Sequence, residues 1–285
     1  MAVAIVIAAL VLFSIAFQLL TPWWLTPLAS NWGSIDTALS VTMWVCGFFF
    51  IALNAFLALS IFRYRHRKGH RAHYDPESVT LERRLTVWTA VGIAALLAPG
   101  LIAWKEFVTV PKDASVVEAV GQQWQWSFRF PGKDGVLGTV NSRLISPDNP
   151  FGLDLDDPYG RDDILVEGSE VHLPRGRPIK VVLRSKDVTH DFFVPQIRAR
   201  MNVVPGMVTY FWFTPTRTGK FEILCGQLCG IGHYTMRGAM VVDEKPAFDA
   251  WLSQQPTFAQ SMAEAGPAAP ADAAGKIGSP AKSVN

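Results

Sequence analysis

The sequence has little charge and few cysteines, and both shortages limit what the protein can be. Charged residues make up 18% of its 285 residues, whereas a typical soluble domain has about 25%. The formal net charge is only +2, and basic residues cluster only beside apolar stretches, so a nucleic-acid-binding protein is excluded. Three cysteines cannot form a disulfide framework, and one of them, Cys46, lies inside an apolar stretch. Cys225 and Cys229 are therefore the one pair available for chemistry.

Asp, Glu, Lys and Arg are absent from three long stretches, at residues 2–20, 37–62 and 85–104. A helix rises about 1.5 Å per residue, so the third stretch would span about 30 Å, which is the hydrocarbon thickness of a bilayer. A purely soluble protein is therefore excluded. We expect residues 1–106 to form a membrane anchor with three spanning helices. A cleaved signal peptide is the less favoured interpretation of the first stretch, because neither a basic n-region nor an Ala-x-Ala site is evident.

The charges of the loops predict the orientation of the anchor. Seven basic residues lie in or beside the connection between the second and third stretches: Arg63, Arg65, Arg67, Lys68, Arg71, Arg83 and Arg84. Basic loops stay on the cytoplasmic side, because Lys and Arg near a membrane segment resist translocation. We therefore expect everything after about Lys105 to lie outside the cytoplasm.

Beyond the anchor, the pattern changes from long apolar runs to short segments typical of β-strands. Segments rich in Val, Ile, Phe and Trp are separated by Gly, Pro, Asp and Asn, at residues 115–130, 178–185, 188–194, 208–213, 221–224 and 238–242. This spacing predicts a β-sandwich or barrel, which we place at residues 107–255. The strongly acidic residues 149–170 are expected to form a long surface loop. Residues 256–285, rich in Ala and Pro, are expected to be a disordered tail.

The segment from Cys225 to Met236 concentrates ligands for soft metals. Cys229, His233 and Met236, with His190 from an earlier strand, make up the ligand set of a blue-copper electron-transfer site. Cys225 adds a second thiolate, and two thiolates can bridge two copper ions with one His left for each. A zinc site would use the two Cys and two His but would give Met236 no role. A redox dithiol would favour Cys-x-x-Cys over the spacing found here. The ligands therefore favour copper.

This loop resembles the CuA loop of subunit II of haem–copper respiratory oxidases (cytochrome c oxidase subunit II), and the chain follows that family in order over about residues 35–252. The matching motifs are Ile35-Asp36, Trp88-Thr89, Gly121-Gln-Gln-Trp-Gln-Trp-Ser127, Asp187-Val-Thr-His-Asp-Phe-Phe-Val-Pro195 and Pro205-Gly206. The resemblance implies a membrane-anchored all-β protein with a cupredoxin-like outer domain, after two family spans and an additional first span. It implies a dinuclear CuA centre held by His190, Cys225, the backbone carbonyl of Gln227, Cys229, His233 and Met236.

The resemblance also implies roles in electron transfer from cytochrome c. Trp124 would admit the electron at the surface above the copper, and Trp126, on the same face of the same strand, would pack in the core. Cytochrome c presents a ring of Lys, so its docking surface should be acidic. Asp187 matches a docking carboxylate of the family. Further candidates come from the acidic segment, for which solubility alone is the alternative explanation: Asp154, Asp156 and Asp157.

Two of the positions that depart from the family bear on its metal and proton sites. Gln227 stands where members commonly have a Glu that reaches a magnesium ion shared with the catalytic subunit. A neutral amide is a poorer ligand for that hard cation, which weakens the case for magnesium at the subunit interface. Leu85 stands where members often place a Glu at the mouth of a proton channel. The copper site is unaffected, because it uses the carbonyl of Gln227.

We therefore interpret the sequence as the subunit through which electrons enter a proton-translocating cytochrome c oxidase of the bacterial plasma (inner) membrane, with its copper domain on the periplasmic side. Electrons would pass from cytochrome c through the copper pair to a haem in catalytic subunit I, where oxygen is reduced; further oxidase subunits would complete the complex. No haem is expected on this chain, and no Cys-x-x-Cys-His motif occurs in it. One alternative is a CuA-containing subunit of a nitric oxide reductase. A less favoured alternative is a membrane-tethered copper carrier, because a carrier needs exposed, exchangeable ligands.

Overall fold

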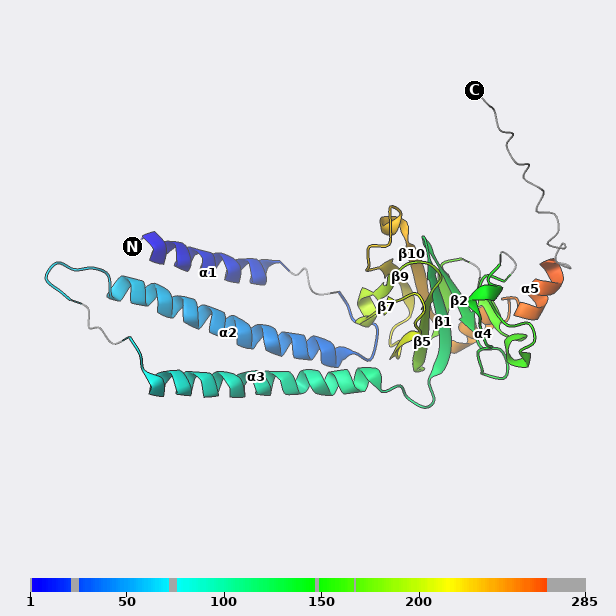
Figure 1. Ribbon diagram of the computed structural model, residues 1–285, viewed down its shortest axis with the longest axis horizontal. Helices are drawn as coiled ribbons and strands as arrows, with labels where there is room; N and C mark the ends of the chain where they lie inside the picture. The colour runs from blue at the N-terminus through cyan, green and yellow to red at the C-terminus, as the bar shows by residue number, and fades with distance from the viewer. Residues whose placement is uncertain (1, 22–25, 72–75, 147–148, 167, 266–285) are drawn as a thin grey trace, which may run out of the picture.

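The computed structural model describes residues 2–21, 26–71, 76–146, 149–166 and 168–265, which form a helical part and a β-sheet part (Figure 1). Three long helices come first: α1 (Ala2–Leu20), α2 (Gly33–Arg63) and α3 (Val79–Val108). Two short helices follow the last strand: α4 (Lys245–Leu252) and α5 (Phe258–Ala265). Figure 1 shows the three long helices side by side, with the β-sheet part at one end of them.

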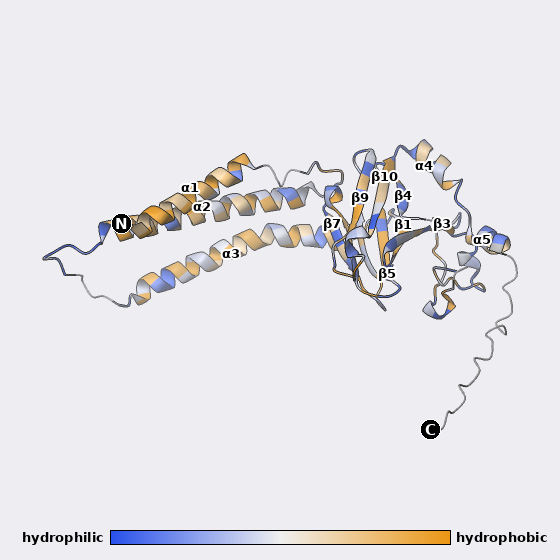
Figure 2. Ribbon diagram, turned by 90° about the horizontal axis from the view of Figure 1, so that it is seen from above, coloured by the Kyte–Doolittle hydropathy of each residue, from blue (hydrophilic) through white to orange (hydrophobic). Residues whose placement is uncertain are grey.

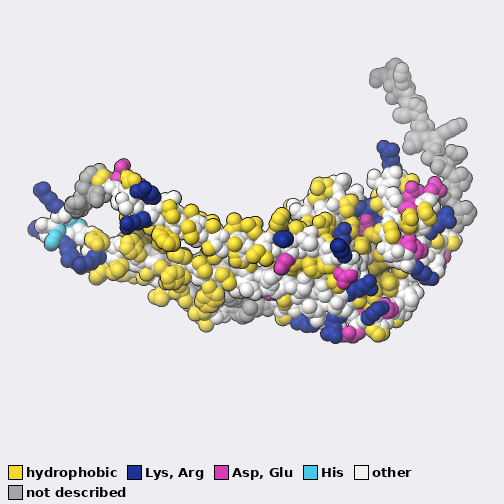
Figure 3. Space-filling view, turned by 90° about the horizontal axis from the view of Figure 1, so that it is seen from below, with side chains coloured by type: hydrophobic (Ala, Val, Ile, Leu, Met, Phe, Trp, Pro, Cys, Tyr) yellow, Lys and Arg dark blue, Asp and Glu magenta, His cyan; other side chains and the backbone are white. Residues whose placement is uncertain are grey.

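The three long helices have the length and composition needed to cross a membrane. None of their described residues is buried, and hydrophobic residues run along each helix (Figure 2). On the surface, hydrophobic side chains cover the helices, whereas charged ones gather at the loop between α2 and α3 and on the β-sheet part (Figure 3). The helical part therefore has the surface of a membrane anchor.

Two helices are longer than the uncharged stretches that predicted them. α2 has 31 residues and α3 has 30, so each is about 45 Å long and exceeds a hydrocarbon layer of about 30 Å. The excess is polar, with Glu82 in the first turn of α3 and Lys105 in its last turn. The absence of charge marks the part of each helix that can lie in the membrane. The backbone hydrogen bonds of a helix do not require apolar side chains, so both helices continue beyond the uncharged stretch at either end.

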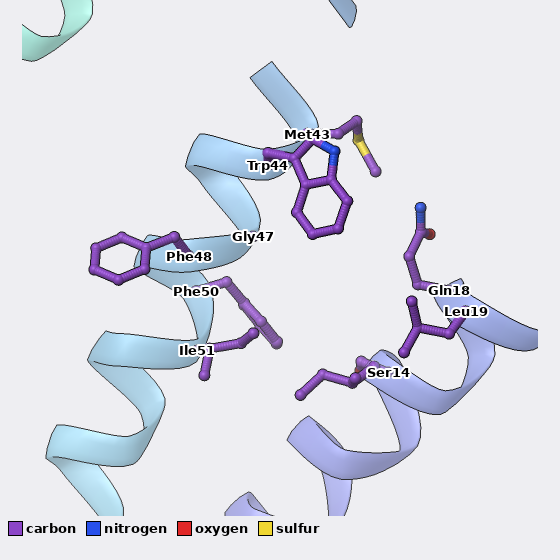
Figure 4. A pocket seen from close by; sticks show the side chains of 10 residues that line it. Ser14, Gln18, Leu19, Met43, Trp44, Gly47, Phe48, Phe50 and Ile51 are labelled. Atoms are coloured by element: carbon purple, nitrogen blue, oxygen red, sulfur yellow. The ribbon is translucent and has the colours of Figure 1, made fainter. Parts of the chain in front are cut away.

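The first helix packs along the second. A crevice of about 450 Å³ separates part of α1 from α2 (Figure 4). Gln18 and Leu19 of α1 face Trp44 and Ile51 of α2 across this crevice. The first apolar stretch is therefore part of the same helical bundle as the second.

The β-sheet part consists of two five-stranded sheets. In the order in which they pair, the strands of the first sheet are β3 (Ile164–Val166), β2 (Gln125–Phe130), β1 (Ser115–Gln122), β5 (Ile179–Ser185) and β8 (Thr209–Phe213). Those of the second sheet are β4 (Glu170–Pro174), β10 (Arg237–Asp243), β9 (Gly219–Cys225), β6 (His190–Val194) and β7 (Ala199–Val203). The β1–β5 and β4–β10 pairs are parallel, and the other pairs are antiparallel.

Aromatic side chains from the two sheets meet in the core. Trp126 of β2 contacts Phe192 of β6, with ring centroids 5.2 Å apart, and Phe192 lies 5.7 Å from Phe211 of β8. All three side chains are at most 3% exposed. Burying each such side chain contributes about 1.5–3 kcal/mol, so these contacts hold the sheets face to face. The expected fold class, a membrane-anchored all-β protein with a cupredoxin-like sandwich, is confirmed.

The acidic residues 149–170 enter the fold, and the prediction of a long surface loop is wrong for the second half of this segment. It contains the 3₁₀ turn η2 (Pro158–Gly160) and strand β3, which pairs with β2. Asp163 is fully buried and lies 2.5 Å from Arg129, which also binds the buried Glu118. A buried carboxylate is costly unless it is paired. Arg129, far away in sequence, supplies that partner.

The prediction of a disordered tail from Pro256 is wrong for residues 256–265. The N–H of Leu165 donates to the carbonyl of Pro256 at 3.0 Å, and the N–H of Phe258 donates to the carbonyl of Asp163 at 2.8 Å. Helix α5 follows, and Phe258 is 2% exposed. One buried aromatic ring and two backbone hydrogen bonds attach this segment to β3. The rest of the expected tail, residues 266–285, lies outside the described residues.

The chain between α1 and α2 joins the anchor to the β-sheet part. Trp32 is buried, donates its indole N–H to the carbonyl of Trp212 at 2.9 Å and contacts Phe107 at the end of α3. Arg198 donates to both carboxylate oxygens of Asp36 in the first turn of α2, at 2.6 and 2.9 Å. These contacts hold the sandwich against the ends of both α2 and α3.

Candidate metal centre

The predicted metal ligands meet at one end of the second sheet. Strand β6 begins at His190 and pairs antiparallel with β9, which ends at Cys225. The chain then forms a loop and the 3₁₀ turn η4 (His233–Thr235) before β10 returns along β9. Neighbouring strands therefore deliver His190 and Cys225, and the loop between β9 and β10 delivers the remaining candidates.

Cys229 lies at the centre of one group of ligand atoms. Its Sγ is 3.5 Å from His233 Nδ1, 3.9 Å from Met236 Sδ and 3.7 Å from Cys225 Sγ. Both cysteines are free thiols, and 3.7 Å is far longer than a disulfide bond, which measures about 2.05 Å. The two sulfur atoms are thus side by side and unbonded.

Cys225 lies at the centre of the second group. Its Sγ is 4.0 Å from His190 Nδ1 and 3.2 Å from the backbone oxygen of Gln227. The ligand atoms of His190, Cys225 and Cys229 all lie within 4.8 Å of one another. Together with the group around Cys229, the structure brings all six predicted ligands to one place.

The donor set fits copper. Met236 is 1% exposed, and its thioether sulfur lies 3.9 Å from the Cys229 sulfur. A tetrahedral zinc site would be complete with two Cys and two His and would leave this buried sulfur without a function. Thiolate, imidazole and a weak thioether together are the ligands of copper electron-transfer sites. The placement of Met236 therefore favours copper over zinc.

The two thiols differ in acidity because their neighbours differ. Burial alone would raise the pKa of Cys225, but hydrogen bonds from His190 and from the backbone outweigh burial and lower it. Burial raises the pKa of Cys229, and the neighbouring Cys225 raises it further. Cys225 therefore ionises first. Both must be thiolates to bind copper, and a bound cation promotes the second ionisation.

Trp124 lies in the turn between β1 and β2, over the loop that carries the ligands. Its side chain is 37% exposed, and its indole N–H donates to the carbonyl of Cys229 at 3.2 Å. The ring packs so closely on Gly232 that a Cβ there would lie 2.4 Å from it. The expectation that Trp124 and Trp126 share one face of a strand is wrong, because the chain turns between them. Trp126 is 1% exposed and packs against Phe192.

Asp187 lies beside the predicted ligands. Its carboxylate accepts hydrogen bonds from the backbone N–H groups of Gln123 and Val188, both at 2.7 Å, and lies 2.8 Å from His190 Nε2. Burial opposes ionisation, but these hydrogen bonds outweigh burial and lower the pKa of Asp187. The carboxylate is therefore charged at neutral pH.

The other three carboxylates predicted for docking belong to the acidic segment and are not drawn into the site. Asp157 accepts hydrogen bonds from the N–H groups of Thr139 and Tyr159, at 2.6 and 3.0 Å. Asp154 accepts one from the N–H of Asp156 at 3.0 Å, and Asp156 is exposed. Their hydrogen bonds shape their own segment.

Several residues that hold the ligand loop were missed in the sequence. The side-chain amide of Gln123 donates to the carbonyl of Cys229 at 2.8 Å. Arg200 donates to the buried Asp191 at 2.9 Å and to the carbonyl of Gly226 at 3.1 Å. A Cβ at Gly226 would lie 2.5 Å from the Asp191 carboxylate, so only glycine fits there. Asp191 follows a predicted ligand directly, which was the one available signal.

Comparisons with known proteins find similar chains. The family described as "Cytochrome C oxidase subunit II, periplasmic domain" matches residues 115–244. The alternative cytochrome c oxidase subunit 2 of Bradyrhizobium diazoefficiens is 55% identical over 259 residues, which cover 91% of this chain and 94% of that protein. The cytochrome c oxidase subunit 2 of Cereibacter sphaeroides is 27% identical over 244 residues, or 80% of each protein. A crystal structure of the periplasmic domain of subunit II of cytochrome oxidase (CoxB) from Bradyrhizobium japonicum is 27% identical and matches 51% of this chain and 95% of that domain, with a TM-score of 0.38.

Proposed function

The chain belongs to the cytochrome c oxidase subunit II family, and from that premise we propose how its residues bring electrons into the oxidase. It is the subunit through which electrons enter the enzyme, and it works within a haem–copper oxidase complex. Its three apolar helices make it a membrane-anchored bacterial protein. The identity to an oxidase subunit over most of both chains favours this function over a nitric oxide reductase subunit or a copper carrier.

Membership in this family implies copper of the CuA type. We propose a dinuclear copper centre that Cys225 and Cys229 would hold through both thiolates. The observation that carries this proposal is the pair of thiol sulfurs 3.7 Å apart with one imidazole nitrogen beside each, at 4.0 and 3.5 Å. The other residues that would hold the two ions are His190, His233, Met236 and, through its carbonyl, Gln227. When bound, such a pair shares the transferred electron between two metals, so little geometry changes on reduction.

The protein's own contribution is to hold these ligands in place and to exclude water. His190, Cys229 and Met236 are 0%, 3% and 1% exposed. The ion pair between Asp191 and Arg200 ties the beginning of the ligand loop to strands β6 and β7. Ligands held by such surrounding contacts need little rearrangement when the charge of the centre changes.

We propose that Trp124 is the electron entry site. Its ring is partly exposed, and its indole N–H meets the carbonyl of Cys229, a residue proposed to bind copper. An electron that reaches the ring thus has one hydrogen bond and the covalent bonds of one residue between it and the centre. Trp124 ligates nothing itself, so its role is separable from metal binding.

Cytochrome c is the proposed donor, with exposed carboxylates as docking charges. The Asp187 side chain is 31% exposed, and the acidic segment adds Asp154, Asp156 and Asp157. Complementary charge speeds the encounter of two proteins, and salt screens that attraction. The acceptor is a haem in catalytic subunit I. We expect no haem on this chain, and the neutral amide of Gln227 weakens the case for a magnesium ion at the subunit interface.

We further propose that the helical part, at about residues 1–106, spans the plasma membrane and that the sandwich lies on the periplasmic side. The basic loop between α2 and α3 supports this orientation, because positive charge near a span stays in the cytoplasm. The copper domain then begins at about residue 107 and extends through α5, which packs against β3.

Turnover of the purified oxidase that contains this chain tests the proposed function. The enzyme should oxidise reduced cytochrome c, and Cys229→Ser should abolish this activity while the haem of the catalytic subunit stays reducible by dithionite. Cys46→Ser, which changes an exposed cysteine of α2, is the matched control and should keep the parental rate. Parental turnover by Cys229→Ser would overturn the proposal.

A further inference from the structure

The Asp187 carboxylate uses both of its oxygen atoms inside the protein. Oδ1 accepts the N–H of Val188 at 2.7 Å and lies 2.8 Å from His190 Nε2, while Oδ2 accepts the N–H of Gln123 at 2.7 Å. The side chain is 31% exposed. The neighbouring ammonium group of Lys186 donates to Gln122 at 2.9 Å. The carboxylate of Asp187 is therefore partly exposed to solvent, while its hydrogen bonds connect it to residues of the metal site.

One of these contacts acts on a proposed copper ligand. The Nδ1 atom of His190 faces the Cys225 sulfur, and its Nε2 atom faces Asp187. If Nδ1 binds a metal, Nε2 carries the ring proton, and this N–H donates a hydrogen bond to the carboxylate. A carboxylate in this position fixes the tautomer and the ring orientation of the histidine and makes it a stronger ligand. His190 is completely buried, so its Nε2 atom meets Asp187 rather than bulk water.

The other oxygen acts on the turn that carries Trp124. Gln123 gives its backbone N–H to Asp187 and its side-chain amide to the carbonyl of Cys229, at 2.8 Å. Trp124 donates to the same carbonyl at 3.2 Å. The turn is therefore held at two points, by Asp187 on one side and by the backbone of Cys229 on the other. Loss of either point leaves the indole ring less firmly placed.

We infer that Asp187 is a positioning residue, which holds His190 and the Trp124 turn in register around the copper centre and sets the potential of that centre through His190. This inference rests on the proposed function. It goes beyond docking, which requires only a negative charge at the surface. Asp156 provides the contrast, because it is an exposed residue of the acidic segment whose backbone N–H bonds to Asp154 of the same segment.

The test compares three variants of the purified oxidase complex: Asp187→Asn, Asp187→Glu and Asp156→Asn. For each variant, copper content, the electron-spin-resonance spectrum and the midpoint potential of the copper centre are measured. Reduction of the centre is then timed with cytochrome c at two salt concentrations and with a small uncharged reductant. The spectrum and the potential report on His190, whereas the salt dependence reports on docking.

We expect Asp187→Asn to weaken copper binding by about 10- to 100-fold, which is the usual cost of losing such a partner. Its potential should rise, by about 59 mV for each tenfold loss of affinity confined to the oxidised state. Asp187→Glu keeps the charge but displaces the carboxylate by one methylene, so it too should change the spectrum and the potential. Asp156→Asn should alter only the salt dependence of the reaction with cytochrome c.

Parental spectra and potentials in both Asp187 variants, with a change only in the salt-dependent encounter, would overturn the inference. If Asp187→Asn does not assemble, the spectrum and potential of Asp187→Glu decide in the same way. If the proposed function itself is wrong, the parental oxidase will lack the signal of a copper pair. That result differs from parental spectra and potentials in the Asp187 variants, so the two failures can be told apart.

Discussion

The contact between Gly232 and Trp124 offers a way to move the indole ring without changing any ligand. A Cβ at Gly232 would lie 2.4, 2.7 and 2.8 Å from three carbon atoms of the ring. Carbon atoms in contact normally lie about 3.5–4.0 Å apart, so Gly232→Ala must displace the ring by about 1 Å. The backbone at Gly232 has a φ of −90°, which alanine adopts without left-handed strain. The strain therefore falls on Trp124.

A shift of this size should interrupt electron transfer. The hydrogen bond from Trp124 Nε1 to the carbonyl of Cys229 measures 3.2 Å, which is at the long end of the normal range. It does not survive an outward movement of about 1 Å, and misplacements of about 1 Å can cost about 100-fold in rate. We expect the reduction of the copper centre by cytochrome c to slow by up to that factor. Copper content and spectrum should be parental, because all six ligands remain.

Stopped-flow reduction of the copper centre in the intact oxidase measures this effect. Tyr234→Phe is the matched control, because Tyr234 lies in the same turn and its side chain is exposed. It should react at the parental rate. A parental rate for Gly232→Ala would refute the assignment of Trp124 as the electron entry site. Loss of copper from Gly232→Ala would refute the view that the position of the Trp124 ring can change without disturbing the copper ligands.

Three further predictions concern the electron entry site, the ligand loop and a buried carboxylate of the core. Trp124→Phe should keep the copper spectrum but slow stopped-flow reduction by cytochrome c, because Phe lacks the N–H that meets Cys229. Gln227→Ala should leave the copper spectrum nearly intact, because the proposed ligand is the carbonyl. Burial raises the pKa of Asp163 from its ordinary value of 3.8 to about 6, although Arg129 lies beside it. The unfolded chain then releases this proton at lower pH than the folded chain, so the contribution of Asp163 to the free energy of unfolding is complete below about pH 4 and falls as the pH rises to about 6. Asp163→Asn should flatten that part of the pH profile of thermal unfolding in detergent.

Each of these predictions has an outcome that contradicts it. Parental electron transfer by Trp124→Phe would make this residue a packing residue only. Loss of copper in Gln227→Ala would mean that the side chain holds the site. An unchanged pH profile for Asp163→Asn would mean that this carboxylate is already ionised throughout the range, with its charge fully balanced by Arg129.

The anchor and the metal ligands could be predicted because both depend on residues close in sequence. A membrane excludes charge from a continuous stretch, so the absence of charged residues marks each long helix directly. Five of the six proposed ligand residues lie in the segment from Cys225 to Met236, which comprises the last residue of β9 and the loop before β10. Spacing within such a loop is visible in the sequence. His190 was identified through its own motif, and strand pairing between β6 and β9 explains why it lies beside Cys225.

Part of what could not be predicted depends on partners distant in sequence, and part depends on local turns and contacts. Asp163 stands in a strongly acidic segment, and only its pairing with Arg129 allows it to be buried. Helix α5 lies within the segment predicted to be disordered, yet burial of Phe258 beside β3 orders it. The different surroundings of Trp124 and Trp126 arise from a turn that the alternation of strand residues does not reveal. The hydrogen bond between Asp187 and His190 joins neighbours in sequence, but it was missed because the two residues were assigned separate roles.

The number of copper ions tests the central claim most directly. The purified oxidase containing the full chain should show, by electron spin resonance, one unpaired electron shared equally by two copper nuclei. Metal analysis should find two more copper ions in this oxidase than in a variant in which both Cys225 and Cys229 are replaced by Ser. Cys225→Ser should remove this shared signal and leave a single-copper spectrum or an empty site. A parental site that holds one zinc ion, or a single copper ion whose spectrum Cys225→Ser does not change, would contradict the account.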